Sequence, residues 1–216
     1  LAKLGEAPGP EQRFAMLAAL TRLRLAACHP RLVDGDSALS SSKLERLLEL
    51  VDTVRAEGGK ALVFSQFVKH LALVREALEA RGVAMQYLDG QTPAAERQAR
   101  VEAFQRGEGE LFLISLKAGG TGLNLTAADH VIHLDPWWNP AVEDQATDRA
   151  HRIGQTRPVT VSRLVSEGTL EEAILALHAE KRELADSLLS EADGAAALSP
   201  EQLLALLRFG GDGGVG

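Results

Sequence analysis

Residues 112–140 read FLISLKAGGTGLNLTAADHVIHLDPWWNP, two short apolar runs separated by a glycine-rich loop. Apolar runs of this length without polar alternation are typical of strands that are buried on both faces of a parallel sheet. The connection between the two runs is short and rich in glycine, and it is not a long helix. The stretch therefore predicts two buried strands joined by a short glycine-rich loop.

Outward from this stretch, strand and helix patterns alternate. Gly82 and Gly107 stand where helices are expected to stop, and Pro93 and Pro140 stand in expected first turns. This alternation predicts an α/β fold in three layers, with a parallel sheet covered by helices on both faces. The expected strands are 60–64, 84–89, 110–115, 130–135 and 159–165, and the expected helices between them are 67–81, 93–106 and 140–153.

Helical patterns flank the sheet on both sides. Residues 11–28 and 43–57 are expected to be helices, and Ser42 with Glu45 forms a possible capping box for the second one. After the sheet, helices are expected at 169–189 and 200–208. The organisation predicted is a helical lead-in with a loop (1–41), an α/β lobe (42–166), C-terminal brace helices (167–209) and a flexible tail (210–216).

The composition is that of an ordinary globular protein, with 45% hydrophobic and 25% charged residues among 216. Its single cysteine, Cys28, excludes an internal disulfide or a multi-thiolate metal site. The sequence contains neither an apolar run long enough for a membrane span nor a signal-peptide pattern. We therefore expect a soluble, intracellular protein, and the start at Leu1 indicates a piece of a longer polypeptide.

The net charge of −7 is unevenly distributed. Residues 1–166 carry 20 basic and 20 acidic side chains, whereas residues 167–216 carry 3 basic and 10 acidic ones. A neutral body leaves room for a local basic groove, but unaided tight binding to DNA is not expected, because non-specific affinity comes mainly from phosphate neutralisation.

In an open α/β sheet the ligand site lies beyond the carboxyl ends of the strands. The glycine loop Lys117–Asn124 occupies such a place, and its glycines allow a phosphate or sugar to approach the backbone closely. It matches neither the dinucleotide fingerprint nor the P-loop pattern. A tight turn without a ligand is the alternative interpretation.

A second candidate is QATDRAHRIGQ, residues 145–155, which follows the fourth strand. As a helix it would place Gln145, Arg149 and Arg152 on one side, and two arginines beside a glycine loop suit the neutralisation of a phosphoryl group. The alternative is a solvated helix face with an Asp148–Arg152 pair.

The adjacent Trp137 and Trp138 stand between two prolines, so we do not expect the two of them to lie in a core together. One of them can stack on a base or wedge against DNA, or cover the edge of the sheet.

No metal site is expected, because His130 and His133 point to opposite faces of one strand. Ser65 is interpreted as a polar residue at a strand end, since the sequence has no G-x-S-x-G elbow.

Taken in order, ALVFSQF, YLDGQT, FLISLKAGGTGLNLTAADHVIHLDPWWNP and QATDRAHRIGQTRPV resemble the C-terminal RecA-like lobe of Swi/Snf-type ATPases of helicase superfamily two. DPWWNP looks like the bacterial form. LRLAACHPRL and GTLEEAILALHAEKRELADSLL, on the flanks, are similar to further segments of the family. The resemblance spans about residues 17–189 and is specific as a combination of motifs.

The resemblance implies roles for individual residues. Arg149 and Arg152 look like arginine fingers, with Gln145 as a supporting contact. Gly119, Gly120, Gly122 and Asn124 look like the motif that couples nucleotide to DNA. The residues that fall where the family contacts the DNA backbone or wedges it are Gln66, Thr92, Lys117 and Trp138.

The resemblance also implies partners. ATP with Mg²⁺ would be bound mainly by an N-terminal RecA-like lobe of the same polypeptide, and the motor would move along double-stranded DNA, with a protein–DNA complex as a possible remodelling target. The expected location is the cytoplasm, in association with the nucleoid. Because the chain has no Walker A sequence and no Asp-Glu dipeptide, we predict that it does not hydrolyse ATP alone.

Three other interpretations stay open at this point. The chain could be a lobe of a strand-separating helicase of superfamily two, although its tail helix and HRIGQ ending speak against this. It could be a non-enzymatic protein-binding module on the same fold, in which Arg149 and Arg152 would be dispensable. It could be a dinucleotide-binding enzyme, but the chain lacks the third glycine that the dinucleotide fingerprint requires.

Overall fold

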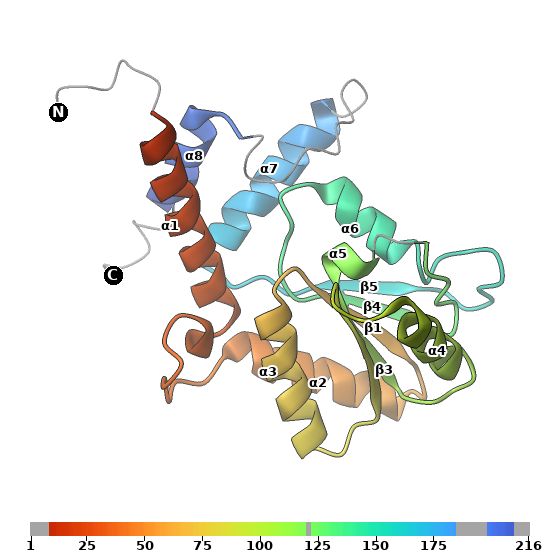
Figure 1. The fold of residues 1–216 in the computed structure, drawn as a ribbon. Helices are drawn as coiled ribbons and strands as arrows, with labels where there is room; N and C mark the ends of the chain where they lie inside the picture. Colours follow the sequence, from red (N-terminus) through yellow and green to blue (C-terminus); the bar gives the residue numbers. More distant parts are fainter. Residues whose placement is uncertain (1–8, 120–121, 185–197, 210–216) are drawn as a thin grey trace. The chain divides into compact units, whose positions relative to one another are not determined.

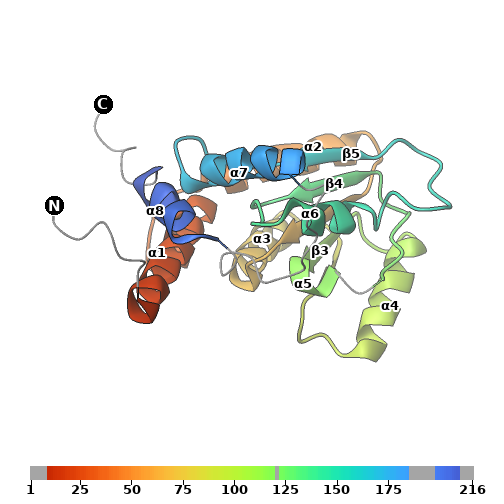
Figure 2. The same ribbon diagram turned by 90° about the horizontal axis from the view of Figure 1, so that it is seen from above.

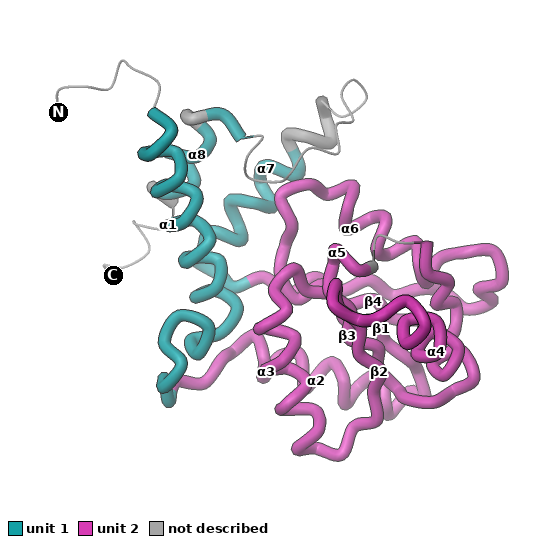
Figure 3. The backbone as a smooth tube through the Cα atoms, viewed as in Figure 1, with its two compact units in different colours: residues 1–38, 166–216 teal, residues 39–165 magenta. Residues whose placement is uncertain are grey.

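The computed structural model describes residues 9–119, 122–184 and 198–209, which form two compact units (Figure 1). One unit comprises residues 39–165 and the other residues 1–38 with 166–216 (Figure 3). The lobe predicted at 42–166 corresponds closely to the first unit. The lead-in and the brace helices, predicted as separate parts, belong to one unit.

The larger unit is built on a five-stranded parallel sheet in the order β2-β3-β1-β4-β5. Its register aligns Val63 of β1 with Leu113 of β3 and Ile132 of β4. The α/β fold class predicted from the sequence is therefore confirmed. The strands are β1 (Ala61–Ser65), β2 (Met85–Leu88), β3 (Leu111–Ser115), β4 (His130–His133) and β5 (Thr160–Arg163).

Helices cover both faces of this sheet (Figure 1). Alternate side chains of β1 face opposite ways, so Val63 packs with α2 (Ser42–Ala56) and α3 (Val68–Ala80), whereas Phe64 packs with α4 (Ala94–Gln105) and α6 (Pro140–Thr147). A short helix, α5 (Leu116–Gly119), follows β3. Two buried layers result, and they hold the strand ends in fixed positions.

Element boundaries differ from the predictions at a few points. The N-cap of α2 is Ser41 and not Ser42, because the Ser41 hydroxyl accepts the Leu44 amide at 3.2 Å. Pro93 is the N-cap of α4 and lies just before its first turn, whereas Pro140 does begin α6. Gly82 and Gly107 end their helices with φ values of 66° and 100°.

The fifth strand is shorter and more exposed than predicted. It forms one edge of the sheet, and three of its four residues are exposed, including Val161. The expectation that every strand is buried on both faces is therefore wrong for β5, since an edge strand has a neighbour on one side only.

The smaller unit contains α1 (Pro10–Cys28), the 3₁₀ turn η1 (Pro30–Leu32), α7 (Leu170–Leu184) and α8 (Pro200–Phe209). Figures 1 and 2 both show α8 alongside α1, and Arg13 on α1 donates to the Leu198 carbonyl at 2.8 Å. The Ser166 hydroxyl donates to the Ala27 carbonyl at 2.7 Å. Helix α7 was predicted to reach residue 189, and its last part lies outside the described residues, as does the tail 210–216.

Candidate nucleotide and nucleic-acid site

The loops that follow β1, β2, β3 and β4 lie at one edge of the sheet, the edge formed by the carboxyl ends of the strands. They do so because parallel strands end on the same side. This edge brings together the loops that carry Gln66, Thr92, Lys117 and Trp138. It also receives α6 and the turn after it. The sequence-predicted residues therefore share one side of the larger unit.

Arg149 and Arg152 do not lie on a helix, contrary to the prediction. Helix α6 ends at Thr147, and Asp148 is its C-cap. The Arg149 and Ala150 amides donate to the carbonyls three residues earlier, and the Arg149 carbonyl accepts the Leu125 amide at 2.9 Å, which ties the chain to the segment after the glycine loop. We call residues 148–154 the arginine turn. No Asp148–Arg152 pair is found among the described residues.

The two arginines differ in their surroundings. Arg149 is only 7% exposed, and its buried Nε has no hydrogen-bond partner among the residues that the structure describes. Burial lowers the pKa of Arg149, the neighbouring Arg152 lowers it further, and Asp148 opposes both effects. Arg152 is exposed, and its Nη1 donates to the Gly122 carbonyl at 3.4 Å. Arg149 therefore carries its positive charge in a buried position beside a second, exposed arginine.

The glycine loop lies against the arginine turn through Gly122. Gly122 has a φ of 60°, a left-handed conformation, and a Cβ added there would meet no atom within 4 Å. Asn124 is exposed and Gly119 ends α5, whereas Gly120 lies outside the described residues. The open space beside Gly122 is consistent with the approach of a ligand.

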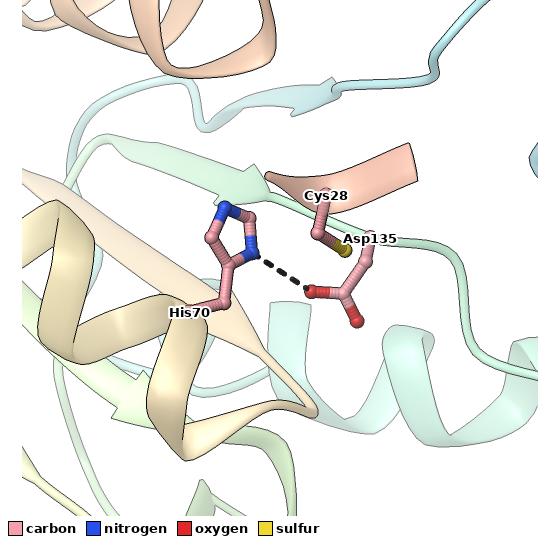
Figure 4. Close-up of side chains that lie close together, drawn as sticks. All are labelled: Cys28, His70 and Asp135. Carbon is pink, nitrogen blue, oxygen red and sulfur yellow. Dashed lines mark ion pairs between the residues drawn. The ribbon is translucent and has the colours of Figure 1, made fainter. Parts of the chain in front are cut away.

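Gln66 is held by the buried carboxylate of Asp135. The Gln66 amide donates to Asp135 Oδ1 at 3.2 Å, and the Ser65 hydroxyl donates to Oδ2 of the same carboxylate. His70 Nδ1 lies 3.8 Å from that oxygen, as the dashed line in Figure 4 marks. Asp135 thus fixes the loop after β1, while the buried Nε2 of Gln66 has no partner among the described residues. Ser65 serves as a polar residue at a strand end.

Thr92 and Lys117 offer different contacts. The Thr92 hydroxyl accepts the Asp89 amide at 3.1 Å and lies 3.3 Å from Asp89 Oδ1, which closes the loop after β2. Burial favours a higher pKa for Asp89, but hydrogen bonds led by that from the Gln91 amide outweigh it and hold the pKa below its usual value. Lys117 is exposed on α5, and α5 and α6 lie side by side (Figure 1). A backbone phosphate can therefore reach the Lys117 ammonium.

Trp138 is 5% exposed, whereas Trp137 is half-buried against the layer of the sheet that contains Phe64. The expectation that the two tryptophans do not both lie in a core agrees with this burial, since only Trp138 is buried. In this structure its indole has too little exposed surface to stack on a base.

Two side chains that bind neighbouring backbone segments were not among the residues predicted for the site. Glu143 is 1% exposed, accepts the Trp137 amide at 2.8 Å and pairs with Arg163 Nε at 2.8 Å. Gln155 bonds several carbonyls beside the arginine turn. The signal for Glu143 was an acidic residue in the first turn of α6. Nothing in the pattern around Gln155 indicated its contacts.

Comparisons with known proteins give the family of the chain. The family described as the helicase conserved C-terminal domain matches residues 42–154. The Sulfolobus solfataricus SWI2/SNF2 ATPase core domain is 36% identical, with a TM-score of 0.77 over 93% of this chain and 42% of that one. The same archaeal core in complex with double-stranded DNA is 36% identical, with a TM-score of 0.75 over 92% of this chain and 43% of the other.

A relative in Bacillus subtilis (strain 168), YwqA, bears the name of an ATP-dependent helicase or translocase and is 43% identical over 90% of this chain and 22% of its own length.

The fold and the site define a helicase-type RecA-like lobe. The chain belongs to the helicase conserved C-terminal domain family and is the C-terminal lobe of a SWI2/SNF2-type ATPase. It spans about a fifth, or less, of the length of the curated relatives that it matches. None of its described helices has the length and apolar character of a membrane span.

Proposed function

We propose that this chain is the second motor lobe of an ATP-dependent translocase or remodelling ATPase that acts on double-stranded DNA. In this proposal it supplies arginine fingers and contacts to the DNA backbone, and an N-terminal lobe of the same polypeptide holds ATP and Mg²⁺. The proposal includes the bacterial form of the family, which the DPWWNP motif suggested. The place of action would be the cytoplasm, at the nucleoid.

The single observation that carries the proposal is the state of Arg149. A guanidinium that is 7% exposed and has an unpartnered buried Nε is costly, and an anion would supply the missing acceptor. Arg152 stands beside it with its side chain exposed. The residues present therefore fit a phosphate group, whose developing negative charge two arginines stabilise during transfer.

The other residues divide into two groups. Gln145, exposed on α6, would support the arginines, and the glycine loop with Gly119, Gly120, Gly122 and Asn124 would couple the nucleotide to DNA. Gln66, Thr92 and Lys117 would contact the phosphate backbone. Trp138 is the weakest of the four proposed DNA contacts, because its indole is buried.

The complex of the archaeal SWI2/SNF2 core with double-stranded DNA supports duplex DNA as the track. Closing and opening of the two lobes would move the motor along it, and a protein–DNA complex on that track would be the target. The test uses the full polypeptide that contains this chain and measures ATP-dependent displacement of a third strand from a triplex, together with unwinding of a duplex.

Triplex displacement without unwinding is the expected result. Unwinding of the duplex at a comparable rate would favour the strand-separating helicase. If neither activity occurs and variants of Arg149 and Arg152 behave like the wild type, the protein-binding module becomes the better interpretation.

A further inference from the structure

One side chain fastens the segment that follows the arginine turn. Gln155 Nε2 lies 3.1 Å from the Thr126 carbonyl, 2.7 Å from that of Ala128 and 3.3 Å from that of Ala150. Its Oε1 accepts the Arg157 amide at 2.9 Å. Both ends of the amide are therefore engaged, and the two N–H groups are shared among three carbonyl oxygens.

The contacts continue on the neighbouring residues. Arg157 Nη2 donates to the Ala127 carbonyl at 3.1 Å, so the carbonyls of residues 126–128 are each bound by Gln155 or Arg157. The backbone N–H of Gln155 also donates to the Arg152 carbonyl at 2.9 Å, which closes the turn. The segment 126–128 and the end of the arginine turn are thereby joined side by side.

A second glutamine binds the same segment from another direction. Gln105, at the end of α4, accepts the Ala127 amide at 2.8 Å and donates to the Thr126 hydroxyl at 3.1 Å. Among the described residues, the Gln105 side chain makes no hydrogen bond to the arginine turn or to the residues that follow it. The two glutamines therefore share a partner segment. Of the two, only Gln155 links this segment to the arginine turn, to Ala150 through its side chain and to Arg152 through its backbone.

We propose that Gln155 is a positioning residue for the arginine turn: it holds Arg149 and Arg152 in one place relative to the glycine loop. This inference rests on the proposed function. Groups that are already oriented when the substrate arrives lower the barrier more than groups that must be ordered, and a displacement of about 1 Å can cost about 10²-fold in rate. The Nε2 group of Gln155, and not its Oε1, makes the side-chain contact to the turn. We therefore expect the N–H donors of this side chain to matter more for turnover than its acceptor.

The test measures DNA-stimulated ATP turnover of the full polypeptide in five forms: wild type, Gln155→Glu, Gln155→Lys, Gln105→Glu and Arg152→Ala. Gln155→Glu keeps the acceptor and loses the donors, whereas Gln155→Lys keeps donors. We expect kcat to fall about 10-fold or more in Gln155→Glu with KM for ATP within about two-fold. Gln155→Lys is expected to retain more activity, and Gln105→Glu to behave like the wild type.

Amide hydrogen exchange gives a readout that does not depend on ATP. The Leu125 amide, which donates to the Arg149 carbonyl, is expected to exchange faster in Gln155→Glu than in Gln105→Glu, while the central amides of β1 stay protected. If Gln155→Glu fails to fold, the comparison of Gln155→Lys with Gln105→Glu still decides, because a lysine that restores turnover supports the role of the donors.

The inference is overturned if Arg152→Ala abolishes turnover while Gln155→Glu keeps wild-type kcat, or if Gln155→Glu and Gln105→Glu lose activity equally. Wild-type turnover in Arg152→Ala as well would instead remove the proposed function on which the inference rests.

Discussion

The Arg152 guanidinium donates to the Gly122 carbonyl, with 3.4 Å between Nη1 and O, across 30 residues of sequence. This contact joins the arginine turn to the glycine loop directly. The Leu125 amide and the Arg149 carbonyl, 2.9 Å apart, join the same two segments a few residues away. In the proposed function, these two contacts would link the nucleotide to the DNA.

Replacing Arg149 by Met is expected to separate stability from function. Because its buried Nε is unpartnered among the described residues, an apolar side chain of similar length removes a desolvation cost, which is about 1–3 kcal/mol for an unsatisfied buried group. Urea unfolding of the 216-residue chain should show an equal or higher free energy of unfolding. ATP turnover of the full polypeptide should collapse. A clear loss of stability would mean that Arg149 is held by contacts within the chain.

Glu143 is expected to be a major determinant of stability in the larger unit. Glu143→Ala leaves the Trp137 amide and Arg163 without their carboxylate, and breaking a buried pair of this kind costs about 2–4 kcal/mol when one partner is partly exposed. Glu143→Gln should cost less, since its carbonyl still accepts the amide. Glu49→Ala, which breaks an exposed pair with Arg46, should change the free energy of unfolding by less than about 0.5 kcal/mol. Equal effects at Glu143 and Glu49 would contradict this account.

His133 is expected to make stability depend on pH. Burial lowers its pKa, an effect that Arg163 reinforces and that Glu143, Asp135 and Asp144 oppose. Since the unfolded chain then binds the proton more readily, stability is fully present above the unfolded value of about 6.5 and decreases as the pH falls below it. Urea midpoints between pH 5 and 7.5 should show this slope. It should disappear in His133→Gln, whose amide can still reach Thr147, and persist in His151→Gln at an exposed position.

Lys117→Gln is expected to weaken DNA binding without altering any sequence preference. A lysine that contacts a phosphate contributes about one unit to the slope of log affinity against log salt. Binding of the full polypeptide to two unrelated duplexes across a salt series measures that slope. Arg46→Gln, on the exposed side of α2, serves as the control of equal charge change. An unchanged slope in Lys117→Gln would remove this residue from the proposed contacts.

Most of the fold could be predicted from the sequence, because it rests on local patterns. Apolar runs such as Leu111–Ser115, glycine stops at Gly82 and Gly107 and a first-turn proline at Pro140 each act on their own segment. The edge position of β5 was missed because strand order is not encoded in any one strand.

The site was predicted less well, since its geometry depends on contacts between distant segments. The periodicity of QATDRAHRIGQ indicated a helix through Ile153, but the helix ends at Thr147, and the Arg149 carbonyl accepts the distant Leu125 amide. Similarly, the burial of Trp138 and of Glu143 results from tertiary packing, which no local pattern around them records.

The most direct test of the central claim is DNA-stimulated ATP turnover of the full polypeptide, compared between the wild type and Arg152→Ala. An arginine finger is worth about 10³–10⁵ in rate, so turnover should fall by about 10³-fold or more while the circular dichroism spectrum stays unchanged. Turnover close to that of the wild type would contradict the claim and make the arginine turn a structural feature of this lobe.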